Sequence, residues 1–168
     1  MATETVTSRI DSRGVAVVTL NNPNKHNVFD DHLITQISAI FEALEADQSV
    51  RVVILQAEGR SFSAGADLGW MRRMADYSHG ENISDATLMA EMFRRINTLS
   101  KPTIARVQGP AFGGGVGLVA CCDLVFATPA AIFCLSEVKL GLIPAVISPF
   151  VVAAIGARAA RRYCMTAE

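Results

Sequence analysis

The chain has 168 residues, of which 51% are apolar and 18% charged, and its formal net charge is −1. This length fits one domain with a sizeable core, so residues 1–168 are treated as a single domain. The 15 basic and 16 acidic residues form no run of one sign, which gives no reason to expect a nucleic-acid partner. The longest apolar stretch, 142–155, is broken by two prolines and is too short to span a bilayer, so we expect no membrane segment.

The cysteines and histidines indicate neither disulfides nor a metal site. Two cysteines are adjacent, two stand alone, and no CxxC pair occurs. The polar residues 1–7 lack the apolar core of a signal peptide, so we expect reduced thiols in a cytoplasmic protein. The three histidines, His26, His32 and His79, lack the spacing of metal ligands.

The N-terminal third of the chain predicts two strands, a helix and a third strand. Alternating residues predict strands at 5–10 and 15–20. Apolar residues at helical spacing over 33–44 predict a helix, with Asp30 as its N-cap. The β-branched run 50–56 predicts a strand that is covered on both faces.

The rest of the chain continues this alternation. The predicted elements are, in order, a loop at 57–66, a helix at 84–99, a strand at 103–107, a glycine-rich turn at 109–117, a helix at 118–122, short strands at 124–126 and 132–134, and two short helices over 148–168. Alternating strands and helices predict a layered α/β domain with right-handed crossovers.

The glycine-rich turn follows a strand and opens a helix, and it has two interpretations. Three successive glycines, 113–115, cost stability, so something must require them. One possibility is the close approach of a backbone N–H to a ligand at a helix N-terminus, and the other is tight packing of helix on strand. A dinucleotide-binding interpretation is weak because Gly115 follows the strand by too many residues. A GxSxG nucleophile motif is also missing around Ser61.

Glu137 is the one promising acid in the sequence. It follows an apolar strand and precedes a second turn that contains glycine and proline. Partial desolvation there should raise the pKa of its carboxyl and suit it to proton transfer. The alternative is a structural charge at a helix N-terminus, or an ion pair with Lys139 or Arg106.

Four motifs occur together in the order 62–67, 109–115, 122–123 and 136–144. In this combination the chain resembles the crotonase superfamily of enoyl-CoA hydratases and isomerases over nearly its whole length. The resemblance implies a crotonase-like α/β core built as a ββα spiral. The segments 106–109, 143–150 and 158–162 look most like the methylglutaconyl-CoA and carboxygeranoyl-CoA hydratase branch, which implies leucine degradation or fatty acid metabolism.

The resemblance also implies roles for individual residues. The backbone N–H groups of Ala66 and Gly114 would bind the thioester oxygen, and Glu137 would act as acid and base. The loop 64–68 would hold the adenine end of coenzyme A, and Lys25 would meet its phosphates. The residues expected to contact coenzyme A are Lys25, Ala64, Gly65, Asp67, Leu68, Gly113, Gly117 and Pro144. No metal or other cofactor is implied, because coenzyme A arrives as part of the substrate.

The chain departs from this pattern at Gly117, where family hydratases with two glutamates carry the first of them. Three interpretations stay open. In the first, Glu137 both deprotonates a single water and delivers the proton to carbon. In the second it shuttles a proton between two carbons in an isomerase, and in the third a substrate carboxylate occupies the space left by Gly117. We favour a hydratase of a branched or carboxylated enoyl-CoA. The alternative from a different functional class is a non-catalytic or inactive acyl-CoA-binding fragment.

The sequence stops at Glu168 within a helix-like pattern. Family members continue with C-terminal helices that close the acyl pocket and build a trimer. We therefore expect a core that lacks this helical region, and a homotrimer or hexamer where the full-length chain is present.

Overall fold

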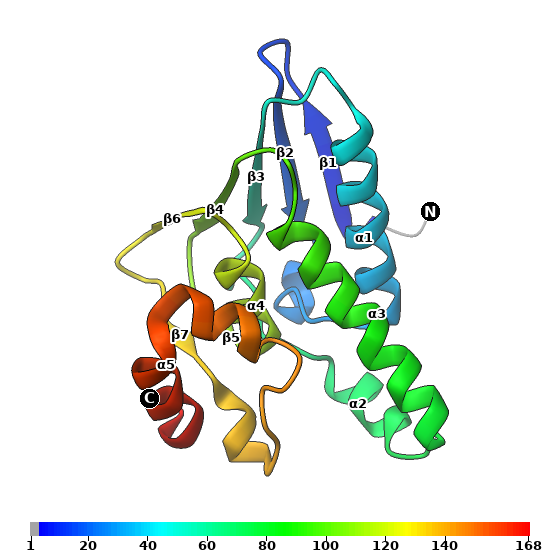
Figure 1. The fold of residues 1–168 in the computed structure, drawn as a ribbon, viewed down its shortest axis with the longest axis vertical. Coiled ribbons are helices and arrows are strands. Elements are labelled where there is room, and N and C mark those ends of the chain that lie inside the picture. Colours follow the sequence, from blue (N-terminus) through cyan, green and yellow to red (C-terminus); the bar gives the residue numbers. More distant parts are fainter. Residues whose placement is uncertain (1–3) are drawn as a thin grey trace.

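The computed structural model describes residues 4–168, and its main element is a five-stranded sheet. The strand order is β1-β2-β3-β4-β6, with β1 antiparallel to β2 and the other pairs parallel (Figure 1). The bounds are Val6–Ile10 (β1), Val15–Leu20 (β2), Val52–Ala57 (β3), Thr103–Val107 (β4) and Leu124–Ala127 (β6). The predicted α/β class is confirmed.

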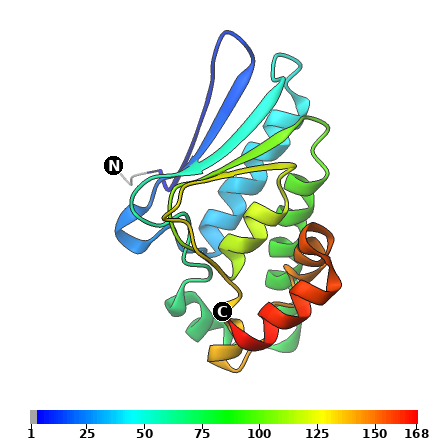
Figure 2. The ribbon, with the colours of Figure 1, turned by 90° about the vertical axis from the view of Figure 1, so that its left-hand side faces the viewer.

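Helices cover one face of this sheet, as Figure 2 shows from the side. The helices are Asp31–Ala46 (α1), Leu68–Met74 (α2), His79–Asn97 (α3), Gly114–Ala120 (α4) and Ser148–Thr166 (α5). Strand β3 was predicted to be covered on both faces, and this is wrong. Its residues alternate: Val53 and Leu55 are buried, whereas Ile54 between them is only partly buried, because the helices pack on one side.

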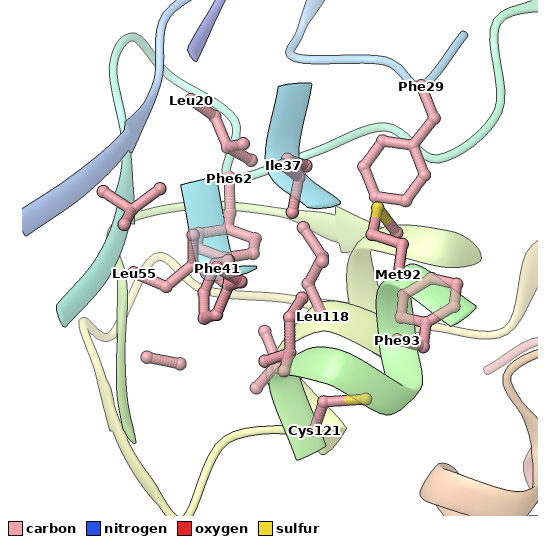
Figure 3. Packing of buried hydrophobic residues seen from close by; sticks show 14 of the residues in the cluster. Leu20, Phe29, Ile37, Phe41, Leu55, Phe62, Met92, Phe93, Leu118 and Cys121 are labelled. Atoms are coloured by element: carbon pink, nitrogen blue, oxygen red, sulfur yellow. The ribbon is translucent and has the colours of Figure 1, made fainter. Parts of the chain in front are cut away.

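The core lies between the sheet and the helices, and Figure 3 shows its packing. Leu20 and Leu55 of the strands meet Ile37 and Phe41 of α1 and Leu118 of α4 there. Burial of such side chains stabilises the fold by about 1.5–3 kcal/mol each. The helical apolar spacing of 33–44 and the alternation in β2 both arise from contact with this core.

Side-chain caps set the beginnings of three helices. Asp30 accepts a hydrogen bond from the Leu33 N–H at 2.8 Å, so the predicted cap of α1 is confirmed. A capping box of Ser78 and Glu81 begins α3 at His79, five residues before the predicted start. Asp67 accepts from the Trp70 N–H at 2.9 Å and begins α2, a helix that the sequence did not predict.

Close packing explains two glycines of α4, which begins four residues earlier than predicted. A Cβ on Gly115 would lie 2.6 Å from the carbonyl oxygen of Ser63. One on Gly117 would lie 2.4 Å from Cγ2 of Ile147. The packing interpretation of the glycine-rich turn therefore holds for these two positions.

The remaining elements carry the chain from the sheet to α5. A two-stranded parallel sheet joins β5 (Ala111–Phe112) to β7 (Phe133–Cys134). The 3-10 turns are η1 (Pro23–Lys25) and η2 (Ser136–Leu140). Gly156 has φ +79° and interrupts α5, so the C-terminal segment consists of two helical pieces, as predicted.

Candidate active site

A cavity of about 830 Å³ opens beside the first turn of α4. Its wall comes from η1, the loop 64–67, α2, the N-terminal half of α3, the start of α4 and η2 with the loop that follows. Figure 1 shows these elements in the half of the molecule below the sheet. The volume suits an organic ligand. Of the residues expected at the site, these line the cavity: Lys25, Ala64, Gly65, Ala66, Asp67, Leu68, Gly113, Gly114, Glu137 and Pro144.

The loop that carries Ala66 is held by Phe29. The Phe29 N–H donates to the Gly65 carbonyl and the Asp67 N–H donates to the Phe29 carbonyl, both at 2.7 Å. Between these two bonds, the Ala66 N–H donates no hydrogen bond within residues 4–168. It is therefore an unused donor in the wall of the cavity.

The loop also touches the start of α4. Gly65 has φ +83°, and a Cβ there would lie 2.9 Å from the Phe112 carbonyl oxygen and 3.5 Å from the Gly114 nitrogen. Gly114 is the first residue of α4, so no earlier helical carbonyl accepts from its N–H. Across the described part of the chain this N–H also has no other acceptor. Two unused backbone donors thus lie on adjacent segments.

The carboxyl of Glu137 lies over Gly113. A Cβ on Gly113 would be 3.0 Å from Oε1 of Glu137 and 3.5 Å from its Cδ. Oε2 is buried and has no hydrogen-bond partner among the described residues. Burial raises the pKa of this carboxyl above its ordinary value, as predicted from the sequence.

The ion pairs weighed for Glu137 do not form. Arg106 donates instead to Oε1 of Gln56 at 2.8 Å. No salt bridge within residues 4–168 includes Glu137 or Lys139. The Glu137 carboxyl is therefore available for a ligand or a proton.

Gly117 is buried and does not line the cavity. The space beside it is filled: a Cβ there would meet Ile147, and it would also lie 2.9 Å from Cε1 of Phe93. The interpretation in which a substrate carboxylate occupies this space is wrong, because two side chains of the protein already occupy it.

The sequence did not reveal the apolar wall supplied by α2 and α3. Trp70, Met71 and Met74 of α2 and Met89 of α3 line the cavity, together with Asp85 of α3. Trp70 is 2% exposed, and its Nε1 has no partner among the described residues. The signal available for α2 was Asp67 as an N-cap, followed by the apolar residues Trp70, Met71 and Met74.

Other reactive groups in the described chain do not form a second centre. Within residues 4–168 no three metal-ligating side chains cluster. The four cysteines are free, and burial raises the pKa of the Cys122 thiol to about 12. The Cys122 thiol therefore stays protonated at neutral pH. None of the helices in this range combines the length and apolar character that crossing a membrane requires.

The fold is an α/β fold, and its cavity is lined by two residues with unused backbone N–H groups and by one residue with a desolvated carboxyl. The family model described as Enoyl-CoA hydratase/isomerase matches residues 11–168. The chain belongs to this enoyl-CoA hydratase/isomerase family.

Solved structures and curated relatives agree with this membership. An enoyl-CoA hydratase from Shewanella pealeana is 46% identical, with a TM-score of 0.94 over 98% of this chain and 62% of that one. An enoyl-CoA hydratase of Alternaria alternata is 36% identical over 95% of this chain and 51% of its own length. A mitochondrial Δ(3,5)-Δ(2,4)-dienoyl-CoA isomerase of Dictyostelium discoideum is 33% identical over 79% of this chain and 48% of its own length. The chain thus spans between about half and two thirds of the length of these relatives.

Proposed function

We propose that the protein is an enoyl-CoA hydratase that adds water across the double bond of an α,β-unsaturated acyl-CoA thioester. The thioester oxygen accepts hydrogen bonds from the N–H groups of Ala66 and Gly114. Addition to the β-carbon pushes an electron pair onto this oxygen and gives an enolate. Each fixed donor is worth about 3 kcal/mol at the transition state on the scale known for oxyanion holes.

Glu137 moves the proton in this proposal. Its ionised carboxyl takes a proton from water while the water oxygen bonds to the β-carbon. The enolate then collapses, and Glu137 returns the same proton to the α-carbon. The observation that carries the proposal is that Glu137, whose buried Oε2 has no partner among the described residues, lines the same cavity as Ala66 and Gly114, whose N–H groups are unused.

The second candidate is an isomerase with a single glutamate, and the surroundings of Gly117 favour it. Ile147 and Phe93 fill the place where a second carboxylate would lie. In an isomerase Glu137 takes a proton from one carbon and returns it to another, and no water adds. The enolate and its two donors are the same in both reactions.

We propose a branched acyl group over a carboxylated one. The apolar wall includes three methionines, whose flexible side chains adapt to irregular shapes. Lys25 is the one basic residue that lines the cavity in the described chain, and the proposal assigns it to the phosphates of coenzyme A. A substrate carboxylate would then lack a cationic partner. The proposed likeness to the methylglutaconyl-CoA and carboxygeranoyl-CoA branch therefore extends to the branching of the acyl group and not to its carboxylate.

The assembly belongs to the same proposal. Strand β6 exposes Leu124, Val125 and Phe126, which are 52%, 46% and 64% accessible. An exposed apolar patch of this kind is typical of a surface that is buried against another protein chain. We propose that the full-length protein forms a homotrimer or hexamer, which sedimentation velocity would distinguish from a monomer.

The test follows the absorbance of the enoyl thioester with crotonyl-CoA, a β-branched enoyl-CoA and a carboxylated enoyl-CoA. Loss of absorbance, fastest with the branched substrate, is expected. A 3-enoyl-CoA that gains this absorbance without hydration would show the isomerase. Binding of all four compounds without turnover would contradict catalysis and favour the non-catalytic acyl-CoA-binding alternative.

A further inference from the structure

We propose that Ser63 is a positioning residue that fixes the Ala66 N–H relative to the Gly114 N–H. This inference rests on the proposed function, in which these two donors bind one oxygen. Ser63 lies in the loop before Ala66, is fully buried, and does not line the cavity. Its role follows from the segments that it joins.

The side chain of Ser63 ties the loop to the segment before α1. Its Oγ donates to the Asn27 carbonyl at 2.8 Å and accepts from the Gly65 N–H at 3.2 Å. Both bonds are buried, so water does not replace them. The hydroxyl therefore fixes the orientation of the peptide that immediately precedes the Gly65–Ala66 peptide.

The backbone of Ser63 ties the same loop to the second donor segment. Its carbonyl accepts from the Phe112 N–H at 2.9 Å, and Ser63 forms an isolated parallel bridge with Ala111. Its Cβ also lies against α4, where a Cβ on Gly115 would be 2.9 Å away. Ser63 thus contacts residues on both sides of Gly114.

Gly65 makes the hydroxyl necessary. Glycine at φ +83° has wide conformational freedom, so the peptide that carries the Ala66 N–H is not fixed by local sterics. Without the Ser63 hydroxyl, the buried Gly65 N–H loses its acceptor, and rotation of the loop toward another acceptor relieves this loss. The bond from the Asp67 N–H to Phe29 remains and preserves the fold. The bond from the Phe29 N–H to the Gly65 carbonyl tilts as the aim of the Ala66 N–H changes, because that carbonyl and this N–H belong to one planar peptide.

The test compares Ser63→Ala with Thr103→Val. Thr103 is also buried and, like Ser63, does not line the cavity. Its hydroxyl likewise donates one hydrogen bond and accepts one, but both are with Asp123 and not with the loop of Ala66. Two readouts are needed. One is kcat and KM for the best enoyl-CoA, and the other is the infrared C=O stretch of bound butyryl-CoA labelled with ¹³C at its carbonyl.

We expect Ser63→Ala to lower kcat about 10- to 100-fold with KM nearly unchanged, since small misplacements of catalytic groups cost this much. The C=O stretch, lowered by binding to the wild type, should return part of the way toward its value in water. Thr103→Val should change neither. Equal effects of the two variants on both readouts, or no effect of Ser63→Ala, would overturn the proposal.

A second variant guards against misfolding of Ser63→Ala. Ser63→Cys keeps a weak donor and acceptor, so its kcat and C=O stretch should lie between those of wild type and Ser63→Ala. If Ser63→Cys has the kcat and the C=O stretch of wild type, the inference is contradicted. Wild type that binds butyryl-CoA without hydrating any enoyl-CoA refutes the proposed function alone, because the C=O comparison still tests Ser63. Wild type that binds no acyl-CoA overturns both.

Discussion

Gly113 and Glu137 are in such close contact that a single added methyl group would press on the proposed acid and base. The Cβ position of Gly113 lies 3.0 Å from Oε1 of Glu137, and the backbone of Gly113 has φ +49°. The residue before the proposed donor Gly114 therefore also forms the floor beneath the carboxyl. This contact couples the proposed oxyanion site to the proposed proton-transfer group.

Gly113→Ala should reduce turnover and stability together. The positive φ costs an alanine about 1–3 kcal/mol of unfolding free energy, and the new Cβ displaces the Glu137 carboxyl. Urea denaturation and kcat measure the two effects. Gly80→Ala is the matched control, because a Cβ at Gly80 in α3 meets nothing within 4 Å. A Gly113→Ala variant as active as Gly80→Ala would contradict the contact.

Glu137→Gln should lower kcat by at least about 10²-fold, the lower end of the contribution of a general acid and base. Acyl-CoA binding, measured by calorimetry, should remain largely intact because the amide keeps the shape of the side chain. Glu42→Gln, an exposed residue of α1 paired with Arg95, is the control and should behave as wild type. Hydration at nearly the wild-type rate by Glu137→Gln removes Glu137 from its role.

The activity should depend on the ionisation of Glu137. Burial raises the pKa of this carboxyl, and the proposed first step needs its ionised form. The ratio kcat/KM should therefore fall as the pH drops through a pKa above the usual value for glutamate, about 4.3. A profile of kcat/KM against pH measures this midpoint. A midpoint at or below 4.3 would show that the group that limits the rate is not a desolvated carboxyl.

The same raised pKa has a consequence for stability. The folded state binds the Glu137 proton more tightly than the unfolded state does, so this group costs stability as the pH rises from the unfolded pKa through the raised folded pKa. Glu137→Gln removes this cost and should have a higher unfolding free energy than wild type at pH 7. Chemical denaturation of wild type and Glu137→Gln at pH 4 and pH 7 measures this difference in unfolding free energy. A larger gain from Glu137→Gln at pH 4 than at pH 7 would contradict the expectation.

Gly117→Ala should destabilise the protein by about 1–3 kcal/mol, the usual cost of overpacking a core. The new Cβ meets Cγ2 of Ile147. In a double-mutant cycle, Ile147→Ala should relieve part of this cost, because it removes that methyl group. Additive losses in the unfolding free energy would show that the two positions do not interact.

Local patterns predicted most of the elements that build the fold. The Asp30 cap with its helical spacing, and the alternation in β2, are local features, and the structure has both. The start of α3 was also readable, since Ser78 and Glu81 have the spacing of a capping box. The prediction for β3 failed because an apolar run does not reveal how many faces are covered.

The parts of the site that escaped prediction depend on contacts distant in sequence. Nothing near Gly117 indicates that Ile147, thirty residues later, fills the space beside it. Likewise, Asp85 and Met89 line the cavity because α3 packs beside α4. The link between Ser63 and Asn27 spans 36 residues and involves a backbone carbonyl, which has no sequence signal.

The central claim is that the backbone amides of Ala66 and Gly114 bind one thioester oxygen. The most direct measurement follows their amide proton resonances by ¹H–¹⁵N NMR during titration with butyryl-CoA, with the amide of Gly80 as reference. Both resonances should move downfield together along one binding curve, while that of Gly80 stays in place. If only one of the two moves, or neither does while butyryl-CoA binds, the amides do not share an oxygen and the account is contradicted.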